Sequence, residues 1–288
     1  DILLKHTDGR KFKGQDIDAV WMRRLADLGK TALEELEPMY QLAAFEEVRY
    51  TFLGFMNSLT QAFHFNHYMQ NRIAEIKEWQ MKIATELGLL QPKSCITNDP
   101  EVLREFIKTC ENGVISKMQG SSLVKKDGES LFVMTNKLDE SQLEDLEGIR
   151  YTPMVFQEFI PKTIEYRATI IGKEIFTIAL DTSQKEVYEV DWRREAHSST
   201  GDWVKAQLPK DIEEKLLAYM DYFHLNYGAA DILLSPDGQH YFLEVNPGGE
   251  FGWADAIWEG KIAEAIANIL SGKIAHRSCS PLFRSLVR

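Results

Sequence analysis

No stretch of the sequence is apolar for long enough to cross a membrane. The longest uninterrupted apolar run, Leu216–Met220, has five residues, whereas a membrane-spanning helix needs about twenty. The opening residues Asp1–Leu4 are predicted to form a short strand. They are not followed by the long apolar stretch and small-residue cleavage site of a secretory signal. We therefore expect no membrane partner.

Cysteine is scarce in this sequence. The three cysteines, Cys95, Cys110 and Cys279, lie far apart, and no two have CxxC spacing. An odd count without that spacing argues against a disulfide scaffold and against a structural zinc site. It favours a reducing compartment, so we expect a cytoplasmic protein.

Basic charge is in deficit, since 33 Lys and Arg residues face 44 Asp and Glu residues for a net charge of −11. A nucleic-acid-binding protein would show a basic footprint, so nucleic acid is not an expected partner. Phosphate ligands stay possible, because they need only a local cluster of Lys and Arg.

The signatures GxxxxGKS/T, GxGxxG after a strand, and GxSxG are also missing. Their absence argues against P-loop enzymes, dinucleotide dehydrogenases and elbow-type hydrolases.

The composition that is present is that of a globular protein, 44% hydrophobic and 27% charged, and 288 residues fit about two domains. We expect a mixed α+β and α/β architecture in four parts: an N-terminal domain at 1–70, a central subdomain at 71–150, a strand-rich C-terminal subdomain at 151–272 and a basic tail at 273–288. Apolar periodicity predicts helices, at 38–58, 71–88, 100–110, 211–224 and 255–270. Apolar runs bounded by turn residues predict strands, at 94–97, 114–118, 131–135, 154–159, 166–171, 174–180, 187–192, 229–235 and 239–246.

The last predicted hairpin carries the sharpest chemical signal. If Asp237-Gly238 is a two-residue turn, Asp231 lies directly across from Glu244, and Asn246 shares their face because side chains alternate along a strand. Two opposed carboxylates repel each other, and a divalent cation would reverse that penalty. Carboxylate and amide oxygens, completed by phosphate oxygens, suit Mg²⁺. The alternative is a solvated acidic face.

Two lysines occupy apolar surroundings in the sequence. Lys117 lies in the predicted strand 114–118, and Lys77 shares a helix face with Ile73 and Ile76. Lysine seldom lies deep among apolar residues without a partner, and a phosphate is one such partner. The alternative is a lysine whose charged end reaches water.

A third signal is the segment 156–162, where a strand runs into Pro161. Its last backbone groups can hydrogen-bond the edge of a planar base while Phe and Ile side chains pack on the base. Glu165 and Arg167 share one face of the next strand. A carboxylate suits a ribose diol there and an arginine suits a phosphate; the alternative is a cross-strand ion pair.

Taken in order, Lys77, Lys117, QEFI at 157–160, Glu165 with Arg167, and Asp231 followed by LEVNP at 243–247 resemble the ATP-grasp fold. Further segments narrow the likeness to the microviridin-type, graspetide-forming peptide ligases over about residues 15–272. These segments are AVWMRR at 19–24, NRIAEIKEWQMKIATELGL at 71–89, ITNDPEVLREF at 96–106, FQEFIPK at 156–162, Asp-Trp-Arg at 191–193 and LEVNPGGEFGW at 243–253.

The resemblance implies an N-terminal pre-ATP-grasp domain, a central lid subdomain and a C-terminal subdomain with an antiparallel sheet, with ATP bound between the last two. It also implies roles for individual residues. Lys77 and Lys117 would hold the ATP phosphates, Glu158 and Ile160 would meet adenine through their backbone with help from Gln157, and Glu165 would hold ribose. Asp231, Glu244 and Asn246 would hold Mg²⁺, while Arg167 and Arg193 would bind the γ-phosphate or the acidic acceptor side chain.

The activity that the resemblance implies is ATP-dependent joining of Asp or Glu side chains of a precursor peptide to Ser/Thr hydroxyls or Lys amines. Two alternatives stay open: a small-molecule carboxylate–amine ligase of the same fold, and a nucleotide-binding regulatory module without turnover. The expected partner is a precursor peptide whose leader docks on the acidic residues Glu186, Glu189 and Asp191, and the enzyme is expected to be a homodimer.

Overall fold

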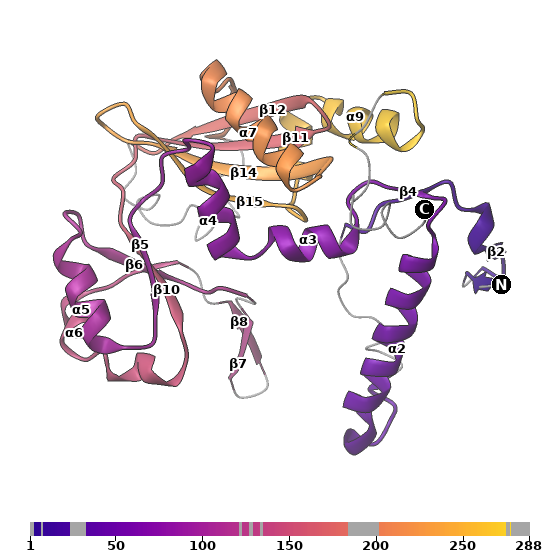
Figure 1. Cartoon of the computed structure of the whole chain (residues 1–288), viewed down its shortest axis with the longest axis horizontal. Coiled ribbons are helices and arrows are strands. Elements are labelled where there is room, and N and C mark those ends of the chain that lie inside the picture. Colours follow the sequence, from indigo (N-terminus) through magenta and orange to yellow (C-terminus); the bar gives the residue numbers. More distant parts are fainter. Residues whose placement is uncertain are drawn as a thin grey trace.

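The computed structural model of the chain describes residues 3–6, 8–23, 33–120, 123–126, 129–132, 135–183, 202–274 and 277. Within these residues, helices and strands form two sheets of different size and an N-terminal part that projects from them (Figure 1). No helix of the described ranges is long and apolar enough to cross a membrane.

The larger sheet is antiparallel throughout, with its described strands in the order β13-β12-β11-β14-β15. The strands are β11 (Ile164–Ile171), β12 (Glu174–Asp181), β13 (Val204–Ala206), β14 (Tyr227–Leu234) and β15 (His240–Asn246). A two-residue turn at Gly172-Lys173 joins β11 to β12, and Gly172 has a φ of +58° that suits glycine. The turn agrees with the two residues left between the predicted strands 166–171 and 174–180.

Helices cover both faces of the larger sheet. Helix α7 (Lys210–Tyr222) and helix α4 (Lys77–Glu86) pack against one face of the sheet and form one core. Alternate side chains of β11, such as Ala168 and Ile170, belong to the same core. Helices α8 (Gly252–Ile257) and α9 (Lys261–Leu270) contribute to a second core on the other face, where Ile171 and Phe176 pack. Alternation along each strand therefore gives the sheet two apolar faces.

The smaller sheet has the described order β5-β10-β6-β9. Its strands are β5 (Ser94–Thr97), β6 (Val114–Lys117), β9 (Asn136–Lys137) and β10 (Met154–Glu158). Helix α5 (Pro100–Lys108), α6 (Glu140–Glu144) and the 3-10 turn η2 (Glu147–Tyr151) lie with it, and the hairpin of β7 (Leu123–Lys126) and β8 (Glu129–Phe132) extends away from it (Figure 1). Residues 154–158, which we placed in the C-terminal subdomain, thus form an inner strand of the smaller sheet.

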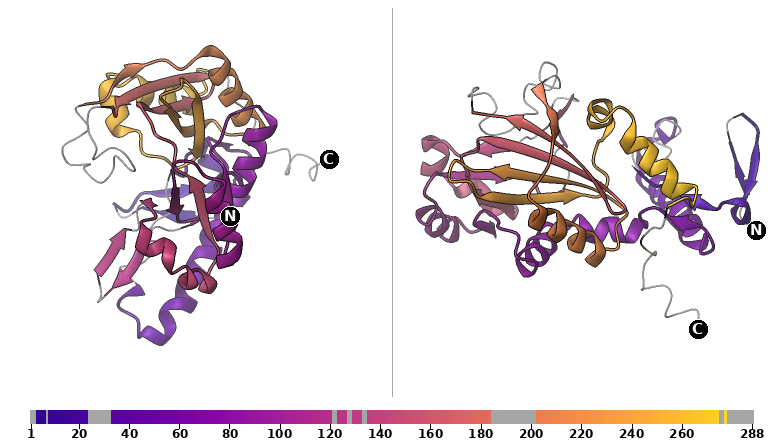
Figure 2. Two further views of the ribbon diagram at one scale, coloured as in Figure 1. Left: turned by 90° about the vertical axis from the view of Figure 1, so that its left-hand side faces the viewer. Right: turned by 90° about the horizontal axis from the view of Figure 1, so that it is seen from above.

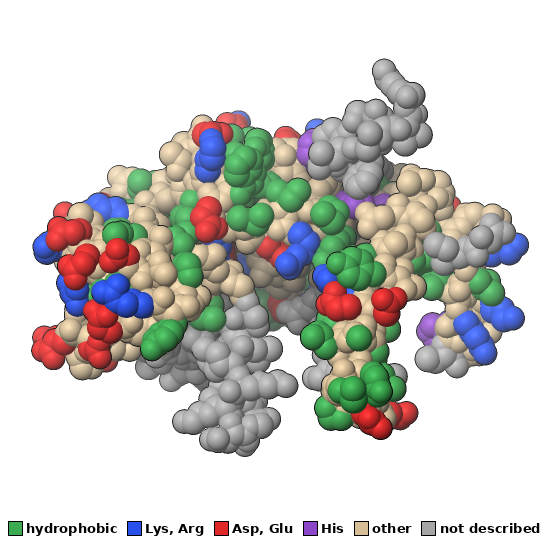
Figure 3. Space-filling view, turned by 60° about the horizontal axis from the view of Figure 1, so that its bottom comes forward, with side chains coloured by type: hydrophobic (Ala, Val, Ile, Leu, Met, Phe, Trp, Pro, Cys, Tyr) green, Lys and Arg blue, Asp and Glu red, His purple; other side chains and the backbone are tan. Residues whose placement is uncertain are grey.

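The N-terminal part begins with the hairpin of β1 (Leu3–Lys5) and β2 (Lys11–Lys13), followed by the 3-10 turn η1 (Gly14–Asp16). Strand β3 (Ala19–Val20) then pairs in parallel with β4 (Phe63–His64). The β1–β2 hairpin lies at the opposite end of the molecule from the smaller sheet (Figure 2). Helix α2 (Pro38–Ser58) matches its predicted bounds and projects from the body, with exposed apolar side chains that include Met39 and Leu42 (Figures 1 and 3).

Two predicted helices are interrupted. The segment 71–88 contains the end of α3 (Tyr68–Ala74) and then α4, so Asn71 lies inside a helix, and His67 is the residue that caps α3. The segment 255–270 is divided into α8 and α9 at Gly260, whose φ is +83°. There the carboxylate of Asp255 accepts from the N–H groups of Ile262 and Ala263, at 2.9 and 3.1 Å, and so caps α9. The predicted strand 187–192 lies outside the described residues.

Candidate functional site

The face of the larger sheet that carries Asp231 and Glu244 is the first part of the candidate site. The two residues are direct cross-strand partners on β14 and β15, as predicted, and Asn246 pairs with Ala229 two residues further along. We call Asp231, Glu244 and Asn246 the metal face.

Asp231 lies opposite Glu244 as predicted, but the hairpin reaches this register through a longer turn and a bulge, neither of which we predicted. Leu234 pairs with His240, so the turn has three residues, 236–238, and Gly238 adopts a φ of +82°. This turn shifts the register by one residue. A bulge at Leu243, between the pairs Ile232–Phe242 and Asp231–Glu244, shifts it back. Our two-residue turn is therefore wrong, although the carboxylate pair that it predicted is confirmed.

Each carboxylate of the metal face is paired with a cation. The Lys77 ammonium lies 2.6 Å from a Glu244 oxygen, and the Arg167 guanidinium lies 2.7 Å from an Asp231 oxygen. Arg167 is the more deeply placed cation, with a side chain that is only 13% exposed. Its burial lowers the pKa of the guanidinium, but the Asp231 carboxylate, with smaller contributions from Tyr227 and Glu244, offsets that effect and the pKa is raised overall. Repulsion between the carboxylates is thus compensated by two positive charges.

The turn after β15 is held close to Arg167. The side-chain oxygen of Asn246 accepts from the Gly248 N–H at 2.9 Å, and the Tyr227 hydroxyl donates to the Gly249 carbonyl at 2.6 Å. A Cβ atom on Gly249 would lie 2.6 Å from a guanidinium nitrogen of Arg167, so only glycine fits there.

The residue after this turn connects the metal face to the N-terminal part. The Glu250 carbonyl lies 3.5 Å from a guanidinium nitrogen of Arg167, and the Glu250 carboxylate forms an ion pair with Arg23. Arg23 in turn lies over the ring of Phe251, 5.3 Å from its centroid. Segments more than two hundred residues apart in the sequence therefore meet beside Arg167.

The second part of the candidate site lies on the smaller sheet. Lys117 of β6 donates to the Gln157 side-chain oxygen at 2.8 Å, and the Gln157 amide donates to the Ser94 hydroxyl at 3.0 Å. These bonds cross the three neighbouring strands β6, β10 and β5. Lys117, which is half-buried at the end of β6, therefore has a polar protein partner in Gln157.

The backbone after β10 leaves one group for a ligand. The Glu158 N–H donates to the Lys93 carbonyl and the Phe159 N–H to the Gly113 carbonyl, at 2.8 and 2.9 Å. Among the described residues, the Ile160 N–H makes no backbone hydrogen bond. The Ile160 N–H is thus unused by these backbone bonds, whereas the Glu158 N–H is occupied, so a contact of Glu158 with adenine would have to use its carbonyl. Both adenine contacts stay predictions.

Glu165 has a buried basic neighbour. Its carboxylate lies 2.5 Å from the Lys162 ammonium, and both side chains are less than a tenth exposed. In the structure Glu165 therefore pairs with Lys162, and its contact with a ribose stays a prediction. Arg193 and the three acidic residues Glu186, Glu189 and Asp191 lie outside the described residues.

The metal face fits Mg²⁺ by its donors. The described residues contain no group of three or more His, Cys, Asp and Glu side chains that could hold a metal, so a cation here would rely on two carboxylates and one amide. Mg²⁺ is the ion that binds through one or two carboxylates and completes its shell with water and phosphate oxygens.

Three polar residues beside these groups were not predicted. They are Lys162, Glu250 and Gln80, and Gln80 contacts the backbone of β15. Lys162 follows Pro161 directly and Gln80 lies one helical turn after Lys77, so spacing alone offered a signal for both. For Glu250 no local pattern indicates a partner as distant as Arg23.

One family model and several solved structures are similar to this chain. Residues 2–72 match the family model of the MvdD pre-ATP grasp domain. Over 96% of this chain and 82% of the other, the structure is similar, with a TM-score of 0.90 and 35% identity, to a Chryseobacterium gregarium RiPP-associated ATP-grasp ligase in complex with ADP and a leader and core peptide.

Two macrocyclases from Microcystis aeruginosa MRC are also similar. MdnC, bound with the precursor peptide MdnA, shares 33% identity with a TM-score of 0.81 over 94% of this chain and 82% of its own. MdnB shares 30% identity with a TM-score of 0.73 over 93% of this chain and 81% of its own. The comparison with curated proteins gave no match.

Proposed function

The chain belongs to the family of RiPP-associated ATP-grasp ligases, and from this premise we propose that it ligates a ribosomal precursor peptide at the expense of ATP. The proposed bonds are crosslinks from Asp or Glu side chains to Ser/Thr hydroxyls or Lys amines. Two observations support a peptide substrate: the Chryseobacterium ligase is in complex with ADP and a leader and core peptide, and MdnC is bound with the precursor peptide MdnA.

The proposed reaction has two steps. A carboxylate oxygen of the substrate attacks the γ-phosphorus of ATP and releases ADP, which leaves an acyl phosphate. The hydroxyl or amine then attacks the acyl carbon, phosphate leaves with the former carboxylate oxygen, and the nucleophile loses its proton. The peptide loses the elements of one water per bond. Most catalysis of such a transfer is positioning and charge neutralisation, so no covalent protein nucleophile is required.

The described cations would supply that neutralisation. Lys117 and Lys77 would contact the phosphates, and Arg167 would stabilise charge at the transferred phosphoryl group. Mg²⁺ on the metal face would neutralise phosphate oxygens as a Lewis acid. The Glu158 carbonyl and the Ile160 N–H would hold adenine, and Gln157 would orient Lys117.

The observation that carries the proposal is the charge balance of the metal face. Asp231 and Glu244 lie opposite each other, and each is matched by one cation from a different element. When ATP and Mg²⁺ bind, the carboxylates would contact the metal and the cations would contact the phosphates. Such a site needs carboxylates and cations close to each other. A module that had lost turnover would not need the carboxylate pair.

Co-expression with a candidate precursor peptide tests the proposal. The wild-type enzyme should lower the precursor mass by one water per crosslink, as measured by mass spectrometry. Glu244→Gln, which keeps the shape of the side chain and removes its charge, should leave the precursor unmodified. Purified enzyme that joins small carboxylates to amines and leaves the precursor unchanged would contradict the peptide-ligase proposal and favour the small-molecule alternative.

The partner surface is the finer part of the proposal. We retain Glu186, Glu189 and Asp191 as the dock of a leader that carries an arginine, on the strength of their clustered negative charge. Glu186→Lys combined with Glu189→Lys should weaken leader binding and leave ADP binding unchanged. Leader affinity that survives both changes at low salt would contradict this dock.

The homodimer stays a prediction, which light scattering of the purified enzyme tests.

A further inference from the structure

Gln80 connects helix α4 to the strand that carries Glu244 and Asn246. Its side-chain oxygen accepts from the Val245 N–H at 2.9 Å, and its amide nitrogen donates to the Val245 carbonyl at 3.0 Å. The same nitrogen lies 2.5 Å from the Ala74 carbonyl at the end of α3. The Gln80 side chain is buried, with only 4% of the residue exposed.

This contact occupies the outer edge of the larger sheet. Strand β15 is the last described strand in the order of that sheet, so Val245 has a strand neighbour on one side only, in β14. The Gln80 amide offers one acceptor and one donor to the other side, as a neighbouring residue of a further strand would. It therefore satisfies two backbone groups that would otherwise be buried without partners.

Val245 lies between the two metal-face residues of β15. Its own side chain is buried in the core, so the alternation of the strand directs Glu244 and Asn246 to the opposite face. A displacement of the Val245 backbone would move both oxygen donors together. Gln80 thus fixes the position of the strand without contacting a ligand itself.

The same helix also carries the lysine of the site. Lys77 is the first residue of α4 and Gln80 lies three residues later, which places both on one face of the helix. Lys77 contacts Glu244 while Gln80 holds Val245, the next residue. One helical turn therefore aligns with two successive residues of β15.

We propose that Gln80 is a positioning residue that holds Lys77 in register with Glu244 and Asn246, so that phosphate and metal contacts form together. This inference rests on the proposed function. Only an amide of this length serves, because a carboxylate in its place would lack the donor that two carbonyls require, and an apolar side chain would lack both groups. We therefore expect Gln80 to act on the coupling between nucleotide and Mg²⁺.

Gln80→Met is the first test, because it keeps the length of the side chain and removes both polar groups. Gln91→Met is the matched control: the Gln91 amide also bonds to α4, at the Met81 carbonyl and the Thr85 hydroxyl, 2.9 and 2.8 Å away, and these bonds lie within the helix region, away from Val245. Calorimetry measures ADP affinity with and without Mg²⁺, and hydrogen exchange measures protection of the segment 243–246.

In wild type, Mg²⁺ should tighten ADP binding. Gln80→Met should reduce that Mg²⁺-dependent gain by about 10-fold to 100-fold, the usual effect of removing a group that orients a metal ligand. ADP affinity without Mg²⁺ should stay close to wild type, and the Val245 N–H should exchange faster. Gln91→Met should change neither quantity.

A merely structural role for Gln80 would lower stability and leave the Mg²⁺-dependent gain intact, and that result would overturn the inference. An equal loss in Gln91→Met would overturn it as well. If Gln80→Met does not fold, Gln80→Asn, which keeps the amide one methylene short of Val245, takes its place. A wild-type enzyme that binds no ADP at any Mg²⁺ concentration would contradict the proposed function, while hydrogen exchange would still test whether Gln80 holds Val245.

Discussion

Asp231 and Glu244 differ in the burial of the cations that pair with them. Arg167 is enclosed beside Asp231, whereas Lys77 beside Glu244 keeps about a quarter of its side chain exposed. Removal of a carboxylate from a buried pair leaves an uncompensated charge, which typically destabilises a protein by about 3 kcal/mol or more. Asp231→Asn should therefore lower the free energy of unfolding by about 3 kcal/mol, and Glu244→Gln by less than about 1 kcal/mol. Urea denaturation of the two variants measures the difference, and equal losses would contradict it.

Lys117 is the cation that the smaller sheet would offer to a nucleotide. A charge-assisted hydrogen bond to a phosphate contributes about 1.5–3 kcal/mol, so Lys117→Ala should weaken ADP binding by at least about 10-fold. Lys82→Ala is the control, since Lys82 is exposed on α4 and pairs with Glu86. Calorimetry measures both dissociation constants. An unchanged ADP dissociation constant in Lys117→Ala would show that Lys117 does not bind the nucleotide and that its hydrogen bond to Gln157 serves the structure.

At the scale of elements, the turn after β15 depends on one glycine. A Cβ on Gly249 would come within 2.6 Å of Arg167 and 2.8 Å of the Ala229 Cβ atom, whereas a Cβ on Gly252 meets nothing within 4 Å. Gly249→Ala should therefore displace Arg167 from Asp231 and reduce ligation at least about 10-fold, with a loss of stability of about 1–3 kcal/mol from overpacking. Gly252→Ala should leave both unchanged. Precursor conversion and thermal melting compare the two, and a fully active Gly249→Ala would show that the turn tolerates a Cβ.

The N-terminus of α3 makes stability dependent on pH. Burial, with a smaller contribution from His64, lowers the pKa of His67 from 6.5 to about 4. Below pH 6.5 the unfolded chain takes up a proton that the folded chain refuses, so stability falls as pH decreases toward 4, by at most about 1.4 kcal/mol per pH unit. His67→Asn removes the titration and keeps a cap for the Met69 N–H, which His67 now provides. Urea denaturation from pH 7.5 to 5 should show a shallower decline for the variant. Parallel profiles would exclude His67 as a cause.

Local patterns predicted most of these elements but not their interruptions. Apolar spacing and Pro38 gave the bounds of α2, and strong strand formers flanking Gly172 gave the β11–β12 hairpin. The division of 71–88 into α3 and α4 depends on Gln80, which bonds to both Ala74 and Val245. The bulge at Leu243 likewise adjusts β15 to its neighbours. Both are set by contacts between distant segments, which periodicity does not record.

At the scale of the whole molecule, the sequence predicted which polar residues share a strand face better than it predicted their distant partners. Asp231, Glu244 and Asn246 share a face as expected, because one hairpin carries all three. Lys77 reaches Glu244 across 167 residues of sequence and Arg23 reaches Glu250 across 227. Such pairs follow from the packing of α4 and the N-terminal part against the larger sheet. Only the order of motifs, read as a resemblance, could place them in one site.

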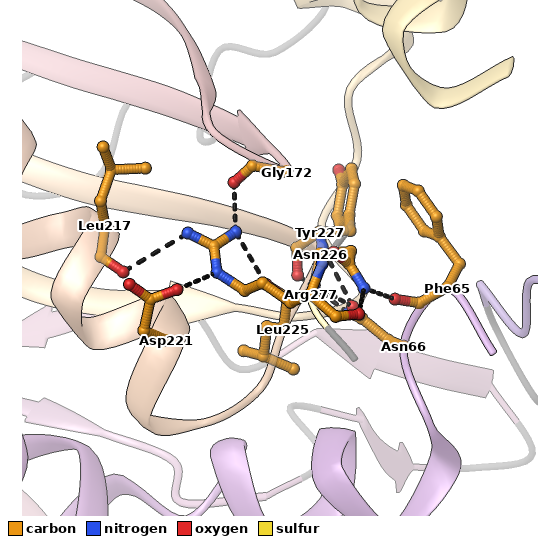
Figure 4. A network of polar contacts seen from close by, with 9 residues as sticks. All are labelled: Phe65, Asn66, Gly172, Leu217, Asp221, Leu225, Asn226, Tyr227 and Arg277. Atoms are coloured by element: carbon orange, nitrogen blue, oxygen red, sulfur yellow. Dashed lines mark hydrogen bonds and ion pairs between the residues drawn. The ribbon is translucent and has the colours of Figure 1, made fainter. Parts of the chain in front are cut away.

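A polar network joins Phe65 and Asn66, which follow β4, and Arg277, the last residue that the structure describes, to the larger sheet (Figure 4). The Asn226 amide donates to the Phe65 carbonyl at 2.9 Å, and its oxygen accepts from the Arg277 N–H at 2.8 Å. Asn66 in turn accepts from the Tyr227 N–H at 3.0 Å and donates to the Pro247 carbonyl at 3.3 Å. The segment after β4, Arg277 and the turn after β15 thus share one set of hydrogen bonds.

Arg277 is the element of this network that a single substitution tests most sharply. Its side chain is only 8% exposed, forms an ion pair with Asp221, and donates to the carbonyls of Gly172 and Leu225 (Figure 4). Buried acceptors that lose a charged donor destabilise the fold by about 1–3 kcal/mol each, so Arg277→Ala should lower the free energy of unfolding by about 3 kcal/mol. Arg72→Ala is the control, because the Arg72 side chain is 63% exposed and forms an exposed ion pair with Glu75, so its removal should change stability by less than about 1 kcal/mol. Small and equal losses of the free energy of unfolding in the two variants, measured by urea denaturation, would mean that the Gly172 and Leu225 carbonyls hydrogen-bond to water once the guanidinium is removed. A large loss in Arg277→Ala alone would show that the guanidinium and its buried carbonyl partners stabilise the fold.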